Sequence, residues 1–109
     1  MQPTIHQLKT WPPSFVDVAE CRMNFQIRRD DRGFKVGDHL VLREYDPDRQ
    51  EHTGRQVERK ITCIFDSAWL LAGEKKPVIA TGFAVLGIVP VPFGQSLLVD
   101  ERPDHVRAA

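Results

Sequence analysis

The chain has 109 residues, of which 41% are hydrophobic and 28% are charged. This length accommodates one domain with a single modest core, and the composition excludes collagen-like and wholly disordered chains. The 15 Lys and Arg residues balance the 15 Asp and Glu residues, so any nucleic-acid site must come from a local basic patch rather than from a basic protein.

Two cysteines, Cys21 and Cys63, are too few for a disulfide framework or a four-ligand zinc site. The start of the chain has no signal-like pattern, and no apolar run approaches the length of a membrane span. We therefore expect a cytoplasmic protein without a membrane contact, a metal or a cofactor. Both thiols are expected to be reduced and packed as small hydrophobic groups.

The first expected elements are a short strand over residues 4–8 and a helix that starts at Pro12 or Pro13. Proline suits the first helical turn because its missing N–H would be unpaired there in any case. Apolar residues then recur at helical spacing, so one face of this helix should pack on a core. The helix is expected to end near Cys21.

A change from helical spacing to alternation predicts strands after the helix. Phe25 and Ile27 alternate with Gln26 and Arg28, which is typical of a half-buried strand. A charged turn over residues 29–33 follows it.

A wide hairpin is the next expected feature. A turn over residues 35–38 leads into an apolar strand over residues 40–42, and chain-breaking residues between 46 and 54 form the hairpin loop. The far arm is expected to be a long strand with four residues on one apolar face: Val57, Ile61, Cys63 and Phe65.

The last part of the expected domain is less regular. Residues 66–76 are expected to be irregular or briefly helical, with Trp69, Leu70 and Leu71 folded back on the core. Residues 78–88 are apolar at both alternations, which predicts a strand covered on both faces.

These elements add up to four or five strands, joined by hairpins, with one or two short helices. The expected fold class is a β-rich α+β domain that closes into a partly open barrel. Residues 1–90 would form this domain. Residues 91–109 would be a C-terminal extension, partly disordered.

Several motifs in a fixed order suggest a family. They are HQLKTWP at 6–12, the run FQIRRDDRGFKVGD at 25–38, LREYDP at 42–47 and TGR at 53–55. In this order they resemble a phage and bacterial family of unknown function within the ASCH superfamily, whose fold is PUA-like. The resemblance covers roughly residues 5–88 and implies RNA as the partner, bound in a cleft beside the first helix.

The same resemblance bears on catalysis. ASCH domains usually carry G-x-K-x-x-E-x-R in the cleft, and the matching residues here are Cys21, Met23, Gln26 and Arg28. Only the arginine agrees with the motif, and Cys21 replaces a glycine that would end the helix in a left-handed conformation. Some ASCH relatives are amidohydrolases acting on acetylated cytidine, and others are proposed nucleases. Met23 cannot activate a nucleophile and Gln26 has no titratable proton, so the sequence favours binding over catalysis.

A hydrolase remains the alternative hypothesis. Asp31 or Glu44 would supply its carboxylate, and Lys9 its amine. A third hypothesis is a protein-interaction module or homodimer, in which Val89–Phe93 and the cluster Leu97–Val99 pack on a partner. The simpler interpretation is that this extension covers an edge of its own barrel.

Binding of RNA, or of a nucleotide-like ligand, is the main hypothesis. Four cations lie within eight residues of the turn after residue 27, relieved only by two aspartates. Arginine forks pair with phosphate oxygens, Trp11 can stack on a base, and the Gln26 amide can bond a base edge. The predicted ligand-binding residues are Lys9, Trp11, Gln26, Arg28, Arg29, Arg32 and Glu44.

Three of these residues also have a purely structural interpretation. Arg28 can pair with Asp31 or Glu44, as charged turns often do. Trp11 can cover the core at the helix start. Glu44 can belong to the shoulder of the hairpin.

Overall fold

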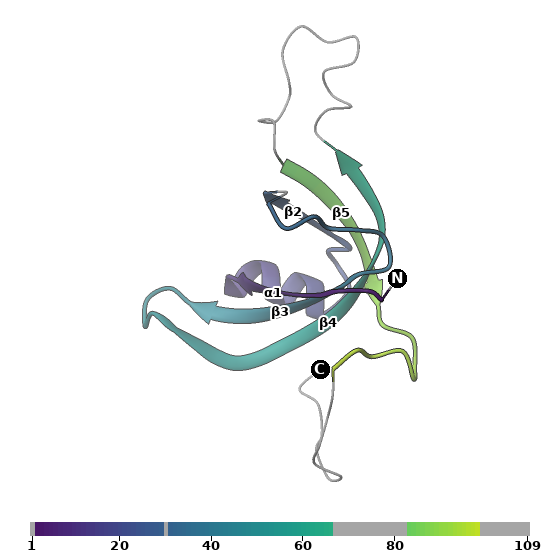
Figure 1. Cartoon of the computed structure of the whole chain (residues 1–109). Coiled ribbons are helices and arrows are strands. Elements are labelled where there is room, and N and C mark those ends of the chain that lie inside the picture. The colour runs from purple at the N-terminus through teal and green to yellow at the C-terminus, as the bar shows by residue number, and fades with distance from the viewer. Residues whose placement is uncertain (1, 30, 67–82, 99–109) are drawn as a thin grey trace, which may run out of the picture.

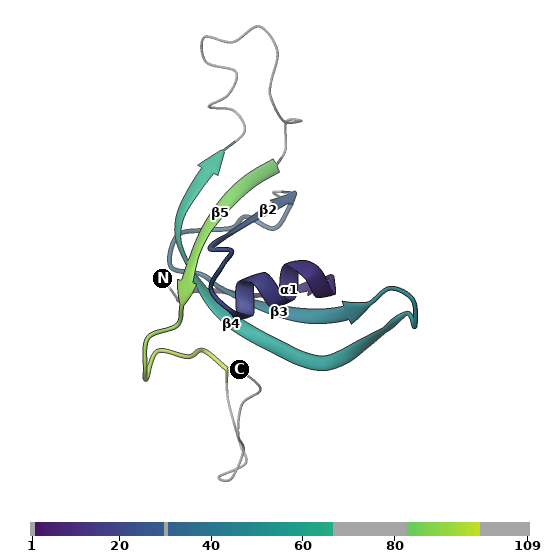
Figure 2. The same ribbon diagram turned by 180° about the vertical axis from the view of Figure 1, so that it is seen from behind.

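The computed structural model describes residues 2–29, 31–66 and 83–98. The strands form one five-stranded sheet in the order β1-β3-β4-β5-β2, curled into an open half-barrel (Figure 1). The single helix of the described residues lies inside the curve of the sheet, as the view from behind shows (Figure 2). The elements in chain order are β1 (Ile5–Thr10), α1 (Pro12–Ala19), β2 (Phe25–Arg29), β3 (His39–Asp46), β4 (Glu51–Asp66) and β5 (Phe83–Pro90). The predicted β-rich, partly open barrel is confirmed.

The concave face of the sheet and α1 enclose the hydrophobic core. Successive side chains of a strand point to opposite faces, so alternate residues of the strands point inward. From the helix, Phe15 and Val18 are fully buried against them. The remaining buried apolar residues of the core are Leu8, Phe34, Leu40, Leu42, Val57, Ile61, Ala84, Leu86 and Ile88.

The helix follows its sequence signals. It begins at Pro12, as predicted, and ends at Ala19. Cys21 then adopts a φ of 61°, the left-handed conformation expected for the glycine that it replaces. The helix therefore has the predicted position.

The connections differ from the prediction for two strands. β1 pairs with β3 in parallel, and β2 pairs with β5 at the far edge of the sheet. Parallel neighbours cannot be joined by a tight hairpin, and here α1 and β2 lie between β1 and β3 in the chain. The expectation that hairpins join all the strands is therefore wrong for β1 and β2.

A β-bulge overturns the predicted face of β4. Ile61 pairs with Ile88 and Cys63 with Gly87, so Thr62 is an extra residue in this strand. Beyond the bulge the alternation is reversed: Ile64 packs against the core, whereas Cys63 and Phe65 are exposed. The four predicted residues therefore do not share one apolar face.

Strand β2 turns its polar side inward. Phe25 and Ile27 are 41% and 51% exposed, whereas the Gln26 side chain is buried. In β5 (Phe83–Pro90) only alternate residues are fully buried. The expectation that this strand is covered on both faces is therefore wrong for residues 83–88. The expectations for residues 67–76 and 78–82, including Trp69, Leu70 and Leu71, lie outside the described residues.

The described part of the C-terminal extension, residues 91–98, folds back on its own sheet. The Glu58 carboxylate on β4 accepts a hydrogen bond from the Leu97 backbone N–H (2.8 Å) and another from the Ser96 hydroxyl. Its Oε2 also lies 2.7 Å from His39 Nδ1. This part of the extension covers its own domain. The boundary at residue 90 stays a prediction.

Within the described residues, no helix has the length and apolar character needed to cross a membrane.

Candidate functional site

A cleft of about 400 Å³ opens between β1 and β2, the two edge strands of the sheet. We call the unpaired gap between these two edges the seam. Its walls come from the end of β1, the start of α1, Met23 and residues 25–28 of β2. The lining residues are Lys9, Thr10, Trp11, Ser14, Met23, Phe25, Gln26, Ile27 and Arg28.

Arg28 crosses the seam. From β2, its Nη1 donates to the backbone carbonyl of Lys9 (3.2 Å) and its Nη2 to the Thr10 hydroxyl (3.1 Å), both on β1. Its Nη2 also donates to Gln26 Oε1 (2.9 Å). One side chain thus joins the two sheet edges at a place where no backbone hydrogen bond does.

The Arg28 guanidinium has no carboxylate partner among the described residues. The interpretation that Arg28 pairs with Asp31 or Glu44 is therefore wrong. Burial, and then the nearby Arg32 cation, lower the pKa of Arg28 from its ordinary value. The bonds to Lys9, Thr10 and Gln26 use three of the five N–H groups of a guanidinium. A partly buried cation with two unused donors remains at the cleft.

Gln26 holds this arginine in place. It is only 6% exposed, and its Oε1 accepts the bond from Arg28. Its Nε2 donates to the Phe25 carbonyl (3.1 Å) and lies 3.7 Å from the Met23 sulfur. Both ends of the amide are thus engaged within the protein. For a base edge, only the second lone pair of Oε1 is left, on a side chain that is almost fully buried.

The other wall of the cleft is apolar and largely exposed to solvent. Trp11 is 59% exposed at the position that precedes the helix, where it makes no side-chain capping bond. Its interpretation as a lid on the core is wrong. Met23, Phe25 and Ile27 complete this wall. An exposed indole beside aliphatic groups offers a flat ligand a place to stack.

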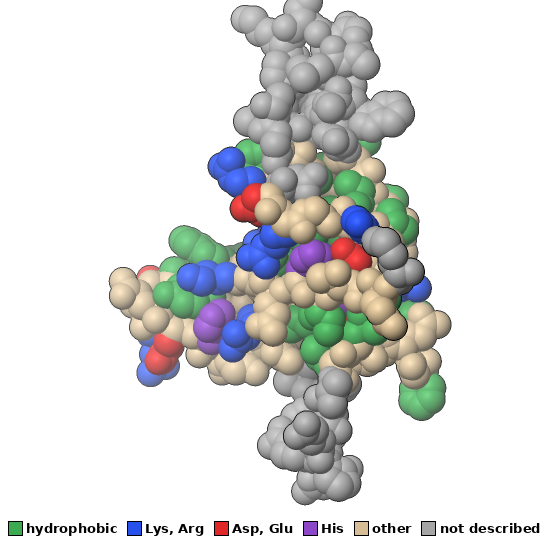
Figure 3. Space-filling view, in the orientation of Figure 1, with side chains coloured by type: hydrophobic (Ala, Val, Ile, Leu, Met, Phe, Trp, Pro, Cys, Tyr) green, Lys and Arg blue, Asp and Glu red, His purple; other side chains and the backbone are tan. Residues whose placement is uncertain are grey.

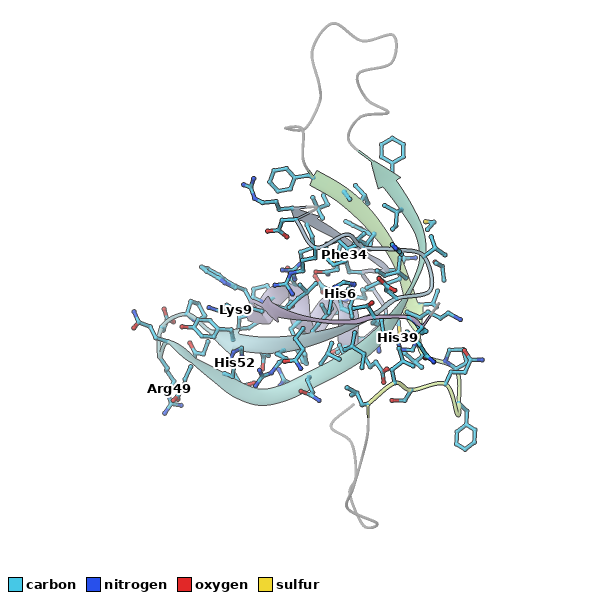
Figure 4. The ribbon with its side chains drawn as sticks, viewed as in Figure 1. His6, Lys9, Phe34, His39, Arg49 and His52 are labelled. Atoms are coloured by element: carbon cyan, nitrogen blue, oxygen red, sulfur yellow. The ribbon has the colours of Figure 1, made fainter. Side chains whose placement is uncertain are left out.

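Lys9 adds a second cation at the rim. Its Nζ lies 4.0 Å from the centre of the Tyr45 ring, a cation–π contact. The Tyr45 ring in turn meets His52 edge to face, with 5.2 Å between ring centres. Figure 4 shows Lys9 near the end of β1 and His52 on the neighbouring hairpin. Lys9 is thereby held near the cleft without an acidic partner in the described chain.

Three predicted site residues lie away from this cleft. Arg29 points from β2 over the Phe83 ring, 5.1 Å from its centre. Arg32 donates from Nη1 to the backbone carbonyl of Gln7 (3.1 Å), farther along the seam. Glu44 is the third.

Glu44 is the buried partner of an ion pair with Arg55. Its carboxylate is 3% exposed and accepts two hydrogen bonds of 2.8 Å from Arg55, through Nε and Nη2. Thr53 donates a third, also of 2.8 Å. The bonds from Arg55, opposed by burial and aided by Thr53, hold the pKa of Glu44 below its ordinary value. The Glu44 carboxylate therefore stabilises the β3–β4 hairpin near its shoulder.

Sequence reasoning missed two hydroxyl groups of the cleft. Thr10 ends β1 and Ser14 lies in the first turn of α1. Only the alternation of β1, in which Leu8 and Thr10 are both buried, could have placed Thr10 on the inner face. No group of His, Cys, Asp or Glu side chains suited to a metal ion occurs within residues 2–29, 31–66 and 83–98.

Comparison with known proteins relates the chain to a protein family and to a phage protein. A family model described as "Domain of unknown function (DUF3850)" matches residues 5–88. A protein of Escherichia phage P2, described as "Uncharacterized 12.9 kDa protein in GpA 3'region", is 37% identical over 71 residues. These residues cover 64% of this chain and 63% of the phage protein, so the chain matches less than two thirds of that relative's length.

Proposed function

This chain belongs to the DUF3850 family, and we propose that it is a small RNA-binding domain whose cleft between β1 and β2 holds RNA or a nucleotide-like ligand. The order of its motifs further leads us to propose that the family is of the ASCH type, with a PUA-like fold. We place its action in the cytoplasm.

The state of Arg28 carries this proposal. A guanidinium that is partly removed from water and has no carboxylate partner in the described chain loses hydration without gaining an ion pair. A phosphate oxygen would supply the missing charge and would accept its unused N–H groups. Lys9 at the rim adds a second cation for the same anion.

The apolar wall supports a nucleotide rather than a bare phosphate. Bases stack on aromatic side chains in single-stranded RNA complexes, and such contacts tolerate any base. Trp11 is exposed enough to present its ring to a base. Because Gln26 is buried and its Nε2 already donates to the Phe25 carbonyl, we expect little discrimination between bases.

Salt-dependent binding of a labelled RNA hexamer tests the proposal. Arg28→Gln should weaken binding at least about tenfold at low salt, whereas its neighbour Arg29 lies over Phe83 and Arg29→Gln should change it little. Lys9→Gln gives a second variant that leaves the bonds of the seam intact. Absence of binding by the wild-type protein at low salt, or equal effects of Arg28→Gln and Arg29→Gln, would contradict the proposal.

The hydrolase alternative has its own assay. In the cleft, Lys9 is the one amine among the lining residues, and no carboxylate lines it. A general acid or base would therefore have to come from the ligand or from residues beyond this lining. Turnover of acetylcytidine or of a labelled RNA panel, abolished by Lys9→Gln, would establish the hydrolase in place of a binding domain.

A further inference from the structure

A larger groove of about 880 Å³ lies at the other end of β1. It is lined by the N-terminal residues 2–4, by most of the loop before β3 (residues 32, 33 and 35–38) and by residues 94–97 of the C-terminal extension. None of its lining residues is shared with the cleft described above. Figure 3 shows blue Lys and Arg side chains on the face that β1 crosses in Figure 1.

The groove is cationic. Arg32, Lys35 and Lys60 line it, and none of them forms an ion pair in the described part of the chain. The hydrogen bond of Lys60 is a long one, 3.5 Å from Nζ to Gln95 Oε1. Three cations therefore line the groove without an ion-pair partner among the described residues.

The one carboxylate of the groove is already satisfied. Asp38 accepts hydrogen bonds from the backbone N–H groups of Thr4 (3.0 Å) and Lys35 (3.1 Å), and it lies 2.9 Å from His6 Nε2. Although burial raises it, these bonds bring the pKa of Asp38 below its ordinary value. Asp38 thus stays charged, but its oxygens hold the loop and the N-terminal segment together instead of pairing with the lysines.

The seam links the groove to the cleft. Arg32 binds the Gln7 carbonyl and Arg28 the Lys9 carbonyl, on the same edge of β1. These two carbonyls lie two residues apart, about 7 Å along an extended strand. The two guanidinium groups are close enough for the Arg32 charge to lower the pKa of Arg28, after the larger effect of burial. Cations therefore follow β1 from one cavity to the other.

We propose that the groove binds the phosphodiester backbone of the same RNA strand that occupies the cleft, so that single-stranded RNA lies along β1. This inference rests on the proposed function and extends it from one nucleotide to several. A chain of phosphates matches a row of cations, and proteins that bind single strands follow the backbone with such a positive groove. Lys35 and Lys60 act as point charges for the phosphates of the strand.

Two probes of different length test the proposal on the full chain: uridine monophosphate and fluorescein-labelled hexauridylate. The variant Lys35→Gln/Lys60→Gln removes the two lysines of the groove. The matched control, Arg22→Gln/Arg49→Gln, removes two exposed cations that line neither cavity; Figure 4 shows Arg49 at the tip of the β3–β4 hairpin.

The lysine variant should bind the hexamer about five- to tenfold more weakly than the wild-type protein, with a salt slope reduced by about 0.7 for each phosphate that it no longer neutralises. Its affinity for the monophosphate should be unchanged, and the control should resemble the wild type with both probes. Hexamer binding that is unaffected by the lysine variant, or equally weakened in the control, overturns the inference while Arg28-dependent binding of the monophosphate still supports the proposed function. Failure of the wild-type protein to bind either probe overturns both.

Discussion

Nη1 of Arg28 on β2 donates a 3.2 Å hydrogen bond to the backbone carbonyl of Lys9 on β1. The sheet of this protein is open, because its edge strands β1 and β2 do not pair through their backbones. Without Arg28, the Lys9 carbonyl would have no partner on β2. The bond makes Arg28 part of the closure of the barrel. It also fixes the cation at the cleft, so the closure of the barrel and the proposed binding depend on the same side chain.

Replacement of Arg28 by lysine separates these two roles. A lysine keeps the charge but is a single point donor, so it cannot bond Lys9, Thr10 and Gln26 in the fixed directions of a guanidinium. We expect Arg28→Lys to lower the free energy of unfolding by roughly 0.5–1.5 kcal/mol, the usual contribution of one net hydrogen bond. Urea unfolding measures it. The same change at Arg29 should have almost no effect, and equal losses at the two positions would contradict the role of the seam.

Trp11 gives a test of stacking that does not involve charge. Because its side chain is 59% exposed, Trp11→Ala should leave the unfolding midpoint nearly unchanged. Loss of a stacked base should weaken RNA binding by about 1–3 kcal/mol. Phe93, exposed on the C-terminal extension and outside both cavities, supplies the control Phe93→Ala. A Trp11→Ala protein that binds RNA as well as the wild type would rule out the stacking.

The ion pair of the buried Glu44 carboxylate with Arg55 should contribute more to stability than an ion pair between two exposed side chains. Arg55→Ala leaves the buried carboxylate with only Thr53 as a donor. Since the Arg55 side chain is more than half exposed, water moderates the loss, and we expect a moderate fall of the urea unfolding midpoint. The exposed pair of Arg49 and Glu51 is the control, with a change within about 0.5 kcal/mol for Arg49→Ala. Equal unfolding midpoints for the two variants would show that the burial of Glu44 has no energetic consequence.

Local sequence signals predicted the helix well. They failed for features that depend on pairing between distant segments of the chain. Proline at the helix start and apolar spacing along it are properties of a few neighbouring residues, and α1 begins at Pro12 as they indicate. The extra residue Thr62 is set by the pairing of β4 with β5, which alternation along one strand cannot reveal. The parallel pairing of β1 with β3 depends likewise on the route of the chain through α1 and β2.

The candidate site shows the same division. The structure places Lys9, Trp11, Gln26 and Arg28 around one cleft, where the motif order had grouped them. Arg29 follows Arg28 directly but lies over the Phe83 ring and does not line the cleft. Glu44 is one of the predicted ligand-binding residues, but in the structure its carboxylate has a partner within the protein. That partner, Arg55, lies across the hairpin, a pairing that the register of β3 and β4 brings about.

Acid should weaken the hydrogen bonds by which Asp38 holds Thr4 and Glu58 holds Ser96 and Leu97. Burial raises the pKa values of Asp38 and Glu58, but hydrogen bonds from the groups around them lower both below the ordinary values of 3.8 and 4.5. Because the unfolded chain then binds protons more readily, this stabilisation is present above those ordinary values and is lost as the pH falls through the lower folded values. Urea unfolding across a pH series should show it.

Asp38→Asn is the variant that tests this pH dependence. It should be less stable than the wild type at neutral pH and should lose less stability on acidification. Asp48→Asn removes the same charge from the exposed hairpin and should follow the wild type. If the stability of the wild-type protein and that of Asp38→Asn changed with pH in parallel, Asp38 would not be a source of this pH dependence.

The end of α1 provides the last prediction. The Arg22 N–H donates to the Asp17 carbonyl (2.8 Å) and the Cys21 N–H to the Val18 carbonyl (3.0 Å), which is the bonding pattern of a Schellman motif. Cys21 holds the left-handed position of that motif with a φ of 61°, where a side chain costs about 1–2 kcal/mol relative to glycine.

Cys21→Gly should therefore stabilise the protein, by roughly 0.5–1 kcal/mol once the greater freedom of glycine in the unfolded chain is subtracted. For a domain of this size, such a gain corresponds to a rise in Tm of about 2–8 °C in a thermal scan. Cys21→Ala removes the thiol but keeps the Cβ, so its Tm should stay near that of the wild type. A gain in Cys21→Ala equal to that in Cys21→Gly would assign the effect to the thiol, and a loss in Cys21→Gly would show that chain entropy outweighs the left-handed conformation.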